Sequence, residues 1–242
     1  MREERRSVAL RLTDWSTSWL RWQAGAALDR IREYDHLDRN RLNARDYLGV
    51  ESALDVRLAG DRLAFAASGG WWTPFAGGNR FGTTGLLAAW RSTADARRPF
   101  WSAVSEISAA SRVAPLALWP GAGTGQGRSG LLRAHPLLTS LEAGDVLTGP
   151  VFGREVAHGS LEYVRPVKQT LAGGLSLAGF ADAARAWHRP DGLDRSPLYV
   201  DAGVGVRARA PGLGGGIRID LARGLRGGGT TLSASWAGSW PR

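Results

Sequence analysis

The 242-residue sequence predicts an all-β protein of the transmembrane β-barrel class, built as an antiparallel meander. Three observations support this prediction. Apolar and polar residues alternate with a period of two in about eleven segments. Many of these segments reach the roughly nine to eleven residues that a tilted strand needs to cross a bilayer. Short connections alternate with longer ones, which is typical of outer-membrane barrels.

The alternating segments follow one another along the whole chain. The alanine-rich stretches 24–32 and 178–187 would also suit helices, but their flanks alternate, so they are interpreted as strands. The predicted strands lie near residues 6–13, 18–30, 47–58, 61–71, 81–91, 98–108, 153–166, 173–187, 198–209, 215–223 and 230–240.

One face of each segment is apolar, and the opposite face carries glycine, serine and charged residues. An apolar face against lipid and a polar face lining a lumen would produce this pattern. We therefore expect the charged positions of two late segments to face the lumen. These positions are Asp201, Arg207, Arg218 and Asp220.

Tryptophans lie near the predicted strand ends, where they would mark the two membrane interfaces. A soluble β-sandwich also alternates, but its strands should be shorter and its solvent face less regularly polar opposite an unbroken apolar face. The tryptophans near short turns are Trp15, Trp19, Trp90, Trp101 and Trp240, and those near long loops are Trp71, Trp72 and Trp187.

Composition argues against several other classes of function. The chain has no cysteine, which removes thiol catalysis, thiolate metal sites and disulfides, and we expect no metal or cofactor. The formal charge is +9, almost wholly from arginine because Lys168 is the only lysine. These arginines occur singly and often beside acidic residues, so nucleic acid is not an expected partner. The first residues contain no apolar signal region, so we expect an N-terminally truncated barrel domain spanning 1–242.

The sequence from about residue 98 to 240, and more loosely the remainder, resembles the C-terminal barrel of the BamA/TamA outer-membrane assembly superfamily, also called the bacterial surface antigen family. Each motif is weak alone, but the set has the order and spacing of the family. The motifs are Leu132-Arg133-Ala134-His135-Pro136, Leu161-Glu162-Tyr163-Val164-Arg165-Pro166, Phe180-Ala181-Asp182-Ala183, Asp201 to Arg207 and Gly216 to Ala222.

The resemblance implies that the long loop near 109–152 is a plug folded back into the lumen. In the family, an arginine at the loop tip meets acidic residues on the two following strands, and the matching residues are Arg133, Glu162 and Asp182. A guanidinium can satisfy two carboxylates through its planar fork. This sequence has Ala134 where the family has glycine and His135 where it has tyrosine or phenylalanine.

The resemblance also implies the rest of the architecture. The chain would form about the last eleven or twelve strands of a sixteen-stranded barrel in the bacterial outer membrane, with the missing strands and periplasmic POTRA domains supplied elsewhere. Its expected partners are outer-membrane lipids and client outer-membrane polypeptides. The loop arginines suit lipopolysaccharide phosphates as a further partner, although ordinary solvated charge is the favoured interpretation of these arginines. The final strand resembles the family's assembly signal through Leu232, Trp236 and Trp240.

The implied role is insertion of outer-membrane proteins or translocation of polypeptides, without bond chemistry. One alternative is a passive barrel or the translocator half of a fusion protein. A barrel lipid hydrolase is less favoured, although His158 and Ser160 share a strand face. The glycine-rich stretch 121–130 lacks the Lys-Ser/Thr of a phosphate loop and is interpreted as a flexible loop.

Overall fold

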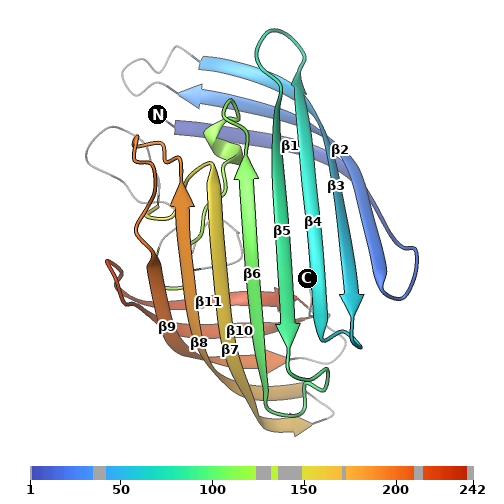
Figure 1. Ribbon diagram of the computed structural model, residues 1–242, viewed down its shortest axis with the longest axis vertical. Helices are drawn as coiled ribbons and strands as arrows, with labels where there is room; N and C mark the ends of the chain where they lie inside the picture. The colour runs from blue at the N-terminus through green and yellow to red at the C-terminus, as the bar shows by residue number, and fades with distance from the viewer. Residues whose placement is uncertain are drawn as a thin grey trace.

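Eleven strands form one antiparallel sheet in which each strand pairs with its neighbours in the chain (Figure 1). The computed structural model describes residues 2–34, 42–123, 132–135, 149–170, 173–209 and 215–238. The strands are β1 (Arg2–Trp15), β2 (Leu20–Tyr34), β3 (Leu42–Leu58), β4 (Leu63–Pro74), β5 (Phe81–Arg91), β6 (Phe100–Ala110), β7 (Glu155–Thr170), β8 (Gly173–Trp187), β9 (Tyr199–Arg209), β10 (Gly215–Gly224) and β11 (Thr230–Gly238).

The predicted all-β meander is confirmed, and each of the eleven predicted segments corresponds to one strand. Both alanine-rich stretches are strands, because a backbone ladder on each side outweighs a weak helix propensity. Several strands run beyond the alternating segments, since ladder hydrogen bonds do not require an alternating sequence. β7 passes Pro166 through a bulge that leaves Val167 without a register partner, a position where a strand tolerates proline.

The two faces of the sheet have inverted polarity compared with a soluble protein. Figure 1 shows the sheet curled, with the described parts of the connection between β6 and β7 on its concave side. Large apolar side chains on the convex face are exposed, for example Leu10 at 73% and Leu232 at 73%. Charged side chains on the concave face are buried, for example Asp29 at 2% and Asp201 at 0%. Buried ionised groups and a broad exposed apolar face are both unusual in soluble proteins.

The described parts of the connection between β6 and β7, residues 111–123, 132–135 and 149–154, cover part of the concave face. It contains a short 3-10 turn, η1 (Leu116–Leu118), which contacts β1. Gly121 and Phe152 form an isolated bridge, and the Ala122 amide donates to the Val151 carbonyl at 3.0 Å. Among the described residues, no helix is long and apolar enough to cross a membrane.

The prediction that Trp72 lies at the membrane interface is wrong. Its side chain is only 3% exposed and stacks on Phe81 on the concave face, with ring centroids 5.3 Å apart. Its Nε1 donates to Asp29 Oδ2 at 2.7 Å. Consecutive strand residues point to opposite faces, so only Trp71, which is 55% exposed, lies on the convex face.

The sheet ends in two open edges. β1 pairs only with β2 and β11 only with β10 among the described strands. Because the strand number is odd and every pair is antiparallel, β1 and β11 run in the same direction. Direct pairing of the two edges would therefore be parallel, unlike every other pair in the sheet. An odd number of intervening strands would keep the whole ladder antiparallel.

The Trp72 ring leaves no room for a larger residue at one neighbouring glycine on the concave face. A Cβ added at Gly70 would overlap the Trp72 ring, whereas a Cβ at the neighbouring Gly69 would lie 3.8 Å from the Thr83 carbonyl oxygen. We expect Gly70→Ala to destabilise the sheet by about 1–3 kcal/mol through overpacking, and Gly69→Ala to have little effect. Thermal unfolding in detergent, followed by far-ultraviolet circular dichroism, measures both; equal melting temperatures would contradict the packing.

Candidate functional site

Four neighbouring strands bring carboxylates together on the concave face. Glu162 lies on β7, Asp182 on β8, Asp201 on β9 and Asp220 on β10. Asp182 and Asp201 are direct register partners. The three aspartates are at most 2% exposed. Burying this many ionised carboxylates is unfavourable unless cations and hydrogen-bond donors surround them.

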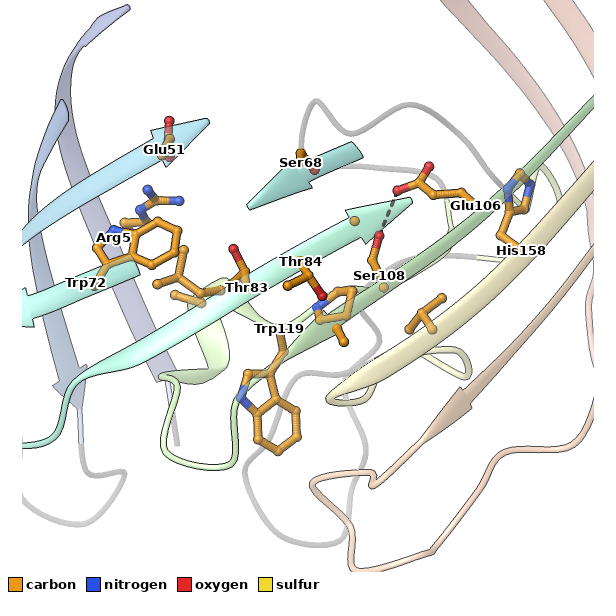
Figure 2. A pocket seen from close by; sticks show the side chains of 17 residues that line it. Arg5, Glu51, Ser68, Trp72, Thr83, Thr84, Glu106, Ser108, Trp119 and His158 are labelled. Atoms are coloured by element: carbon orange, nitrogen blue, oxygen red, sulfur yellow. Dashed lines mark hydrogen bonds between the residues drawn. The ribbon is translucent and has the colours of Figure 1, made fainter. Parts of the chain in front are cut away.

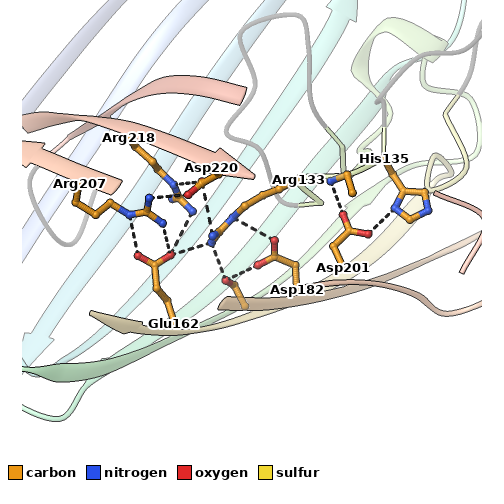
Figure 3. A network of polar contacts seen from close by, with 10 residues as sticks. Arg133, His135, Glu162, Asp182, Asp201, Arg207, Arg218 and Asp220 are labelled. Atoms are coloured by element: carbon orange, nitrogen blue, oxygen red, sulfur yellow. Dashed lines mark hydrogen bonds and ion pairs between the residues drawn. The ribbon is translucent and has the colours of Figure 1, made fainter. Parts of the chain in front are cut away.

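Two arginines of the sheet bridge these acids, as Figure 3 shows. The Arg207 guanidinium makes a bidentate contact with Glu162. Its Nε donates to Oε1 and its Nη2 donates to Oε2, both at 3.0 Å. Its Nη1 donates to Asp220 Oδ1 at 2.6 Å. Arg218 donates to Asp220 Oδ2 at 2.7 Å and to Glu162 Oε2 at 3.3 Å. Charge-assisted bidentate contacts of this kind are short and directional.

Arg133 adds a third guanidinium, which comes from the β6–β7 connection. Its Nη2 donates to Glu162 Oε2 at 3.0 Å, and its Nε lies 3.1 Å from Asp182 Oδ2 in an ion pair. Nη1 lies 3.7 Å from Asp220 Oδ2. The guanidinium carbon is 3.5 Å from the centroid of the Phe180 ring, a cation–π arrangement. One side chain therefore joins the connection to β7, β8 and β10.

The charge of Arg133 depends on this setting. Burial lowers the pKa of its guanidinium, and the positive charge of Arg218 lowers it further. The carboxylates of Asp182, Glu162 and Asp220 act in the opposite direction. The acidic residues therefore stabilise the charged arginine, just as the arginine makes their burial possible.

The next two residues of the connection are held by Asp201. The Ala134 amide donates to Asp201 Oδ2 at 2.6 Å, and His135 Nδ1 lies 2.6 Å from Asp201 Oδ1. His135 Nε2 lies 3.0 Å from the Arg226 carbonyl oxygen, in the turn between β10 and β11. Two apolar clusters pack beside these contacts. Ala134 packs with Phe180 and Ala222. Leu132 belongs to a second cluster, whose other buried members are Ala122, Val151, Val156, Ala184 and Ala186.

A cavity of about 440 Å³ lies beside this network, between the β6–β7 connection and the middle of the sheet (Figure 2). Its wall is mixed and includes two acidic side chains: Glu106 accepts a hydrogen bond from Ser108 at 2.8 Å, and Glu51 accepts two from Arg11 at 3.1 and 3.0 Å. Trp119 closes one side from the connection. Within the described residues, no group of three or more acidic or histidine side chains is placed to hold a metal ion.

Ser160 and His158, the residues considered for hydrolysis, have different surroundings in the structure. Ser160 donates its hydroxyl hydrogen to Asp182 Oδ1 at 2.7 Å and lies 3.4 Å from Arg133 Nη2. His158 instead lines the cavity. Ser160 therefore supports the charged network.

The sequence placed Arg133, Glu162 and Asp182 in one cluster and treated Asp201, Arg207, Arg218 and Asp220 as separate lumen-facing charges. The structure joins the side chains of six of these residues and Ser160 in one network. Asp201 contacts the Ala134 amide and His135, the two residues that follow Arg133. The signal for His135 was its position two residues after Arg133 in the same motif. Of the expected C-terminal signal, Leu232 and Trp236 are exposed on β11, and Trp240 lies outside the described residues.

Comparison with known proteins identifies the fold. No protein-family model matches the chain, and no curated protein matches it in sequence. The structure is similar to the crystal structure of BamA from Haemophilus ducreyi lacking POTRA domains 1–3, with a TM-score of 0.68 and 11% sequence identity. The similarity covers 97% of this chain and 54% of that one, so this chain spans about half the length of the BamA chain. The fold is that of a BamA-type β-barrel sheet.

Proposed function

We propose that this chain is an integral β-barrel protein of the bacterial outer membrane. The supporting observation is the inverted polarity of a single sheet: apolar side chains cover the convex face, and ionised groups are enclosed on the concave face. Lipid tails would cover the convex side chains, and the concave face would line the barrel interior. The BamA-type fold agrees with this location.

In this proposal, further strands complete the barrel between β11 and β1. Unpaired strand edges are not tolerated in hydrocarbon, because each unsatisfied backbone group there costs several kcal/mol. The parallel orientation of β1 and β11 calls for an odd number of added strands, and the five that a sixteen-stranded barrel would add satisfy this condition. The comparison supports the same idea, since about half of the BamA chain has no counterpart here. POTRA domains would belong to the same missing part.

The proposed activity is insertion of outer-membrane proteins or translocation of polypeptides, with client polypeptides as partners and no bond chemistry. The observation that carries it is the Arg133 contact with β7, β8 and β10, which pins a connecting segment inside the sheet. Polar groups of a client polypeptide could replace the contacts of Arg133 with the acidic residues. The segment would then be held in place without a client and would move when a client enters. Lipids and lipopolysaccharide would surround the barrel.

A passive barrel remains the second candidate. The cavity beside the pinned segment favours it, because charged side chains such as Glu51 and Glu106 line it and a water-filled interior would suffice for a pore. The two candidates differ in whether displacement of the β6–β7 connection changes the assembly of other proteins.

Membrane depth is tested by two arginine substitutions at exposed apolar positions. Ile219 lies in the middle of β10 and is 44% exposed, while Leu225 lies just beyond the strand and is 64% exposed. We expect Ile219→Arg to destabilise the inserted protein by about 2–4 kcal/mol, and Leu225→Arg by about 0–1 kcal/mol. The folded fraction recovered with outer membranes measures the difference. Equal tolerance of both variants would mean that water covers the convex face.

The role of Arg133 is tested by Arg133→Ala, with Arg98→Ala as the control. Arg98 is 80% exposed and pairs only loosely with Asp95 at 3.4 Å. Removing the Arg133 guanidinium leaves buried carboxylates uncompensated, which costs about 3–5 kcal/mol. We expect faster protease cleavage of the β6–β7 connection and weaker assembly of other outer-membrane proteins.

The two readouts of this experiment separate the candidates. Unchanged protease cleavage in Arg133→Ala would show that the network does not hold the connection. Faster cleavage with normal assembly of other proteins would support the passive barrel and contradict the assembly role.

A further inference from the structure

Two aromatic rings lie side by side on the convex face where β6 begins and β7 ends, at the lower edge of the sheet in Figure 1. Trp101 on β6 and Tyr163 on β7 are register partners, and their ring centroids are 5.0 Å apart. Trp101 is 46% exposed. In the proposed membrane, aromatic side chains near strand ends mark the level of the lipid headgroups.

An arginine lies on the same face, closer to the short turn. Arg165 follows Tyr163 by two residues on β7, so both side chains point to one face of the sheet. Its register partner is Leu177, which is 52% exposed on the convex face. An arginine facing lipid is costly at the bilayer midplane and nearly free of cost at the interface. Arg165 is exposed, and its charge lies at the depth of lipid phosphates.

The bulge in β7 brings a second cation to the convex face. The register of β7 against β8 shifts between Pro166 and Lys168, and Val167 is the extra residue. Strict alternation from Arg165 would put residue 168 on the concave face. The bulge instead places Lys168 opposite Leu175, which is 40% exposed on the convex face.

The next residue agrees with this shifted register. Gln169 pairs with Gly174, and a Cβ added at Gly174 would lie 2.5 Å from Gln169 Oε1. Gly174 is in phase with Ser176, whose side chain is on the concave face and is 8% exposed. Gln169 therefore faces inward. Lys168, the only lysine of the chain, faces outward with Arg165 and is exposed.

The positive charge of this patch is not neutralised by the described part of the protein. Among the residues that the structure describes, neither Arg165 nor Lys168 forms an ion pair with a carboxylate. The turn before β6 contributes Asp95, which pairs with Arg98 at 3.4 Å, and also Arg97. The surroundings are therefore cationic, and a ligand that neutralises them must be an anion able to lie on an apolar, aromatic surface.

We propose that Trp101, Tyr163, Arg165 and Lys168 form a headgroup site for an anionic phospholipid of the inner leaflet. The proposal rests on the outer-membrane location proposed above, in which the short turns face the periplasm. Arg165 would bind the phosphate through its planar fork, and Lys168 would add a point charge. The two rings would pack against the glycerol and the first carbons of the acyl chains.

The site is tested with fluorescent probes on the convex face. The chain has no cysteine, so Val167→Cys, between the two cations, and Leu58→Cys, at the short-turn end of β3, each provide one attachment point. Val167 is 60% exposed and Leu58 is 43% exposed. The protein is extracted from outer membranes, labelled and reconstituted in bilayers. Quenching is compared between nitroxide-labelled phosphatidylglycerol, which is anionic, and nitroxide-labelled phosphatidylcholine, which has no net charge.

At residue 167 we expect phosphatidylglycerol to bind about fivefold or more tightly than phosphatidylcholine, because one cation near an anionic headgroup contributes about that factor. At residue 58 the preference should be close to one. Combining Arg165→Gln with Lys168→Gln should remove the preference at residue 167. The matched control combines Arg30→Gln with Arg223→Gln, which removes two exposed arginines near the long-loop ends of β2 and β10 and should leave the preference intact.

The outcomes separate this site from the proposed membrane location. If neither lipid quenches either probe, the convex face does not contact a bilayer and both proposals are wrong. Equal quenching by the two lipids at residue 167, with quenching at residue 58, would keep the membrane location and overturn the headgroup site. An equal preference at residues 58 and 167 would also overturn it, as would a preference that survives the loss of Arg165 and Lys168, because the overall charge of the protein would then attract the lipid.

Discussion

A single curled sheet encloses only its concave face, and the buried ionised residues of this chain lie on that face. Strand alternation makes that choice for every strand at once, because one face carries the valines, leucines and isoleucines and the other carries the charges. No second sheet is packed over the concave face in the described residues. The acids there must therefore be neutralised by cations from the same sheet or from a connecting segment.

The two halves of the sheet solve this problem differently. In the N-terminal half, cations come from neighbouring strands: Arg5 forks onto Asp29 at 2.8 and 3.0 Å, and Arg21 donates to Asp55 at 2.9 Å. In the C-terminal half, Arg207 and Arg218 do not suffice, because four carboxylates converge from four adjacent strands. The β6–β7 connection supplies the remaining positive groups, and the cavity lies between the two halves. Neutralisation thus explains why this connection is drawn onto the concave face.

The sequence was enough to predict the strands and their faces, because both follow from a period-two pattern that the pleated backbone enforces. It also placed Arg133, Glu162 and Asp182 together, but only through resemblance to a family motif. The strand register brings Asp201 and Asp220 beside this cluster. The successive pairings of β7 with β8, β8 with β9 and β9 with β10 decide which carboxylates become neighbours.

Two residues show why the rest was beyond sequence reasoning. Trp72 lay among tryptophans expected at a membrane interface, yet small residues on its own face, Gly49 and Gly70, leave it an inward space beside Asp29. Such a space depends on which residues lie opposite in neighbouring strands. His135 looked like a substitution for an aromatic residue, and its partner Arg226 O is a backbone atom more than ninety residues away. Side-chain patterns carry no information about a backbone acceptor of that kind.

The identity of residue 135 changes what holds the tip of the connection. A tyrosine or phenylalanine would act mainly through buried apolar area. The imidazole buries less apolar surface, and its contribution rests on its contacts with the Asp201 carboxylate and the Arg226 carbonyl oxygen. Hydrogen-bond contacts are directional, so they fix where residue 135 lies relative to β9 and to the turn between β10 and β11.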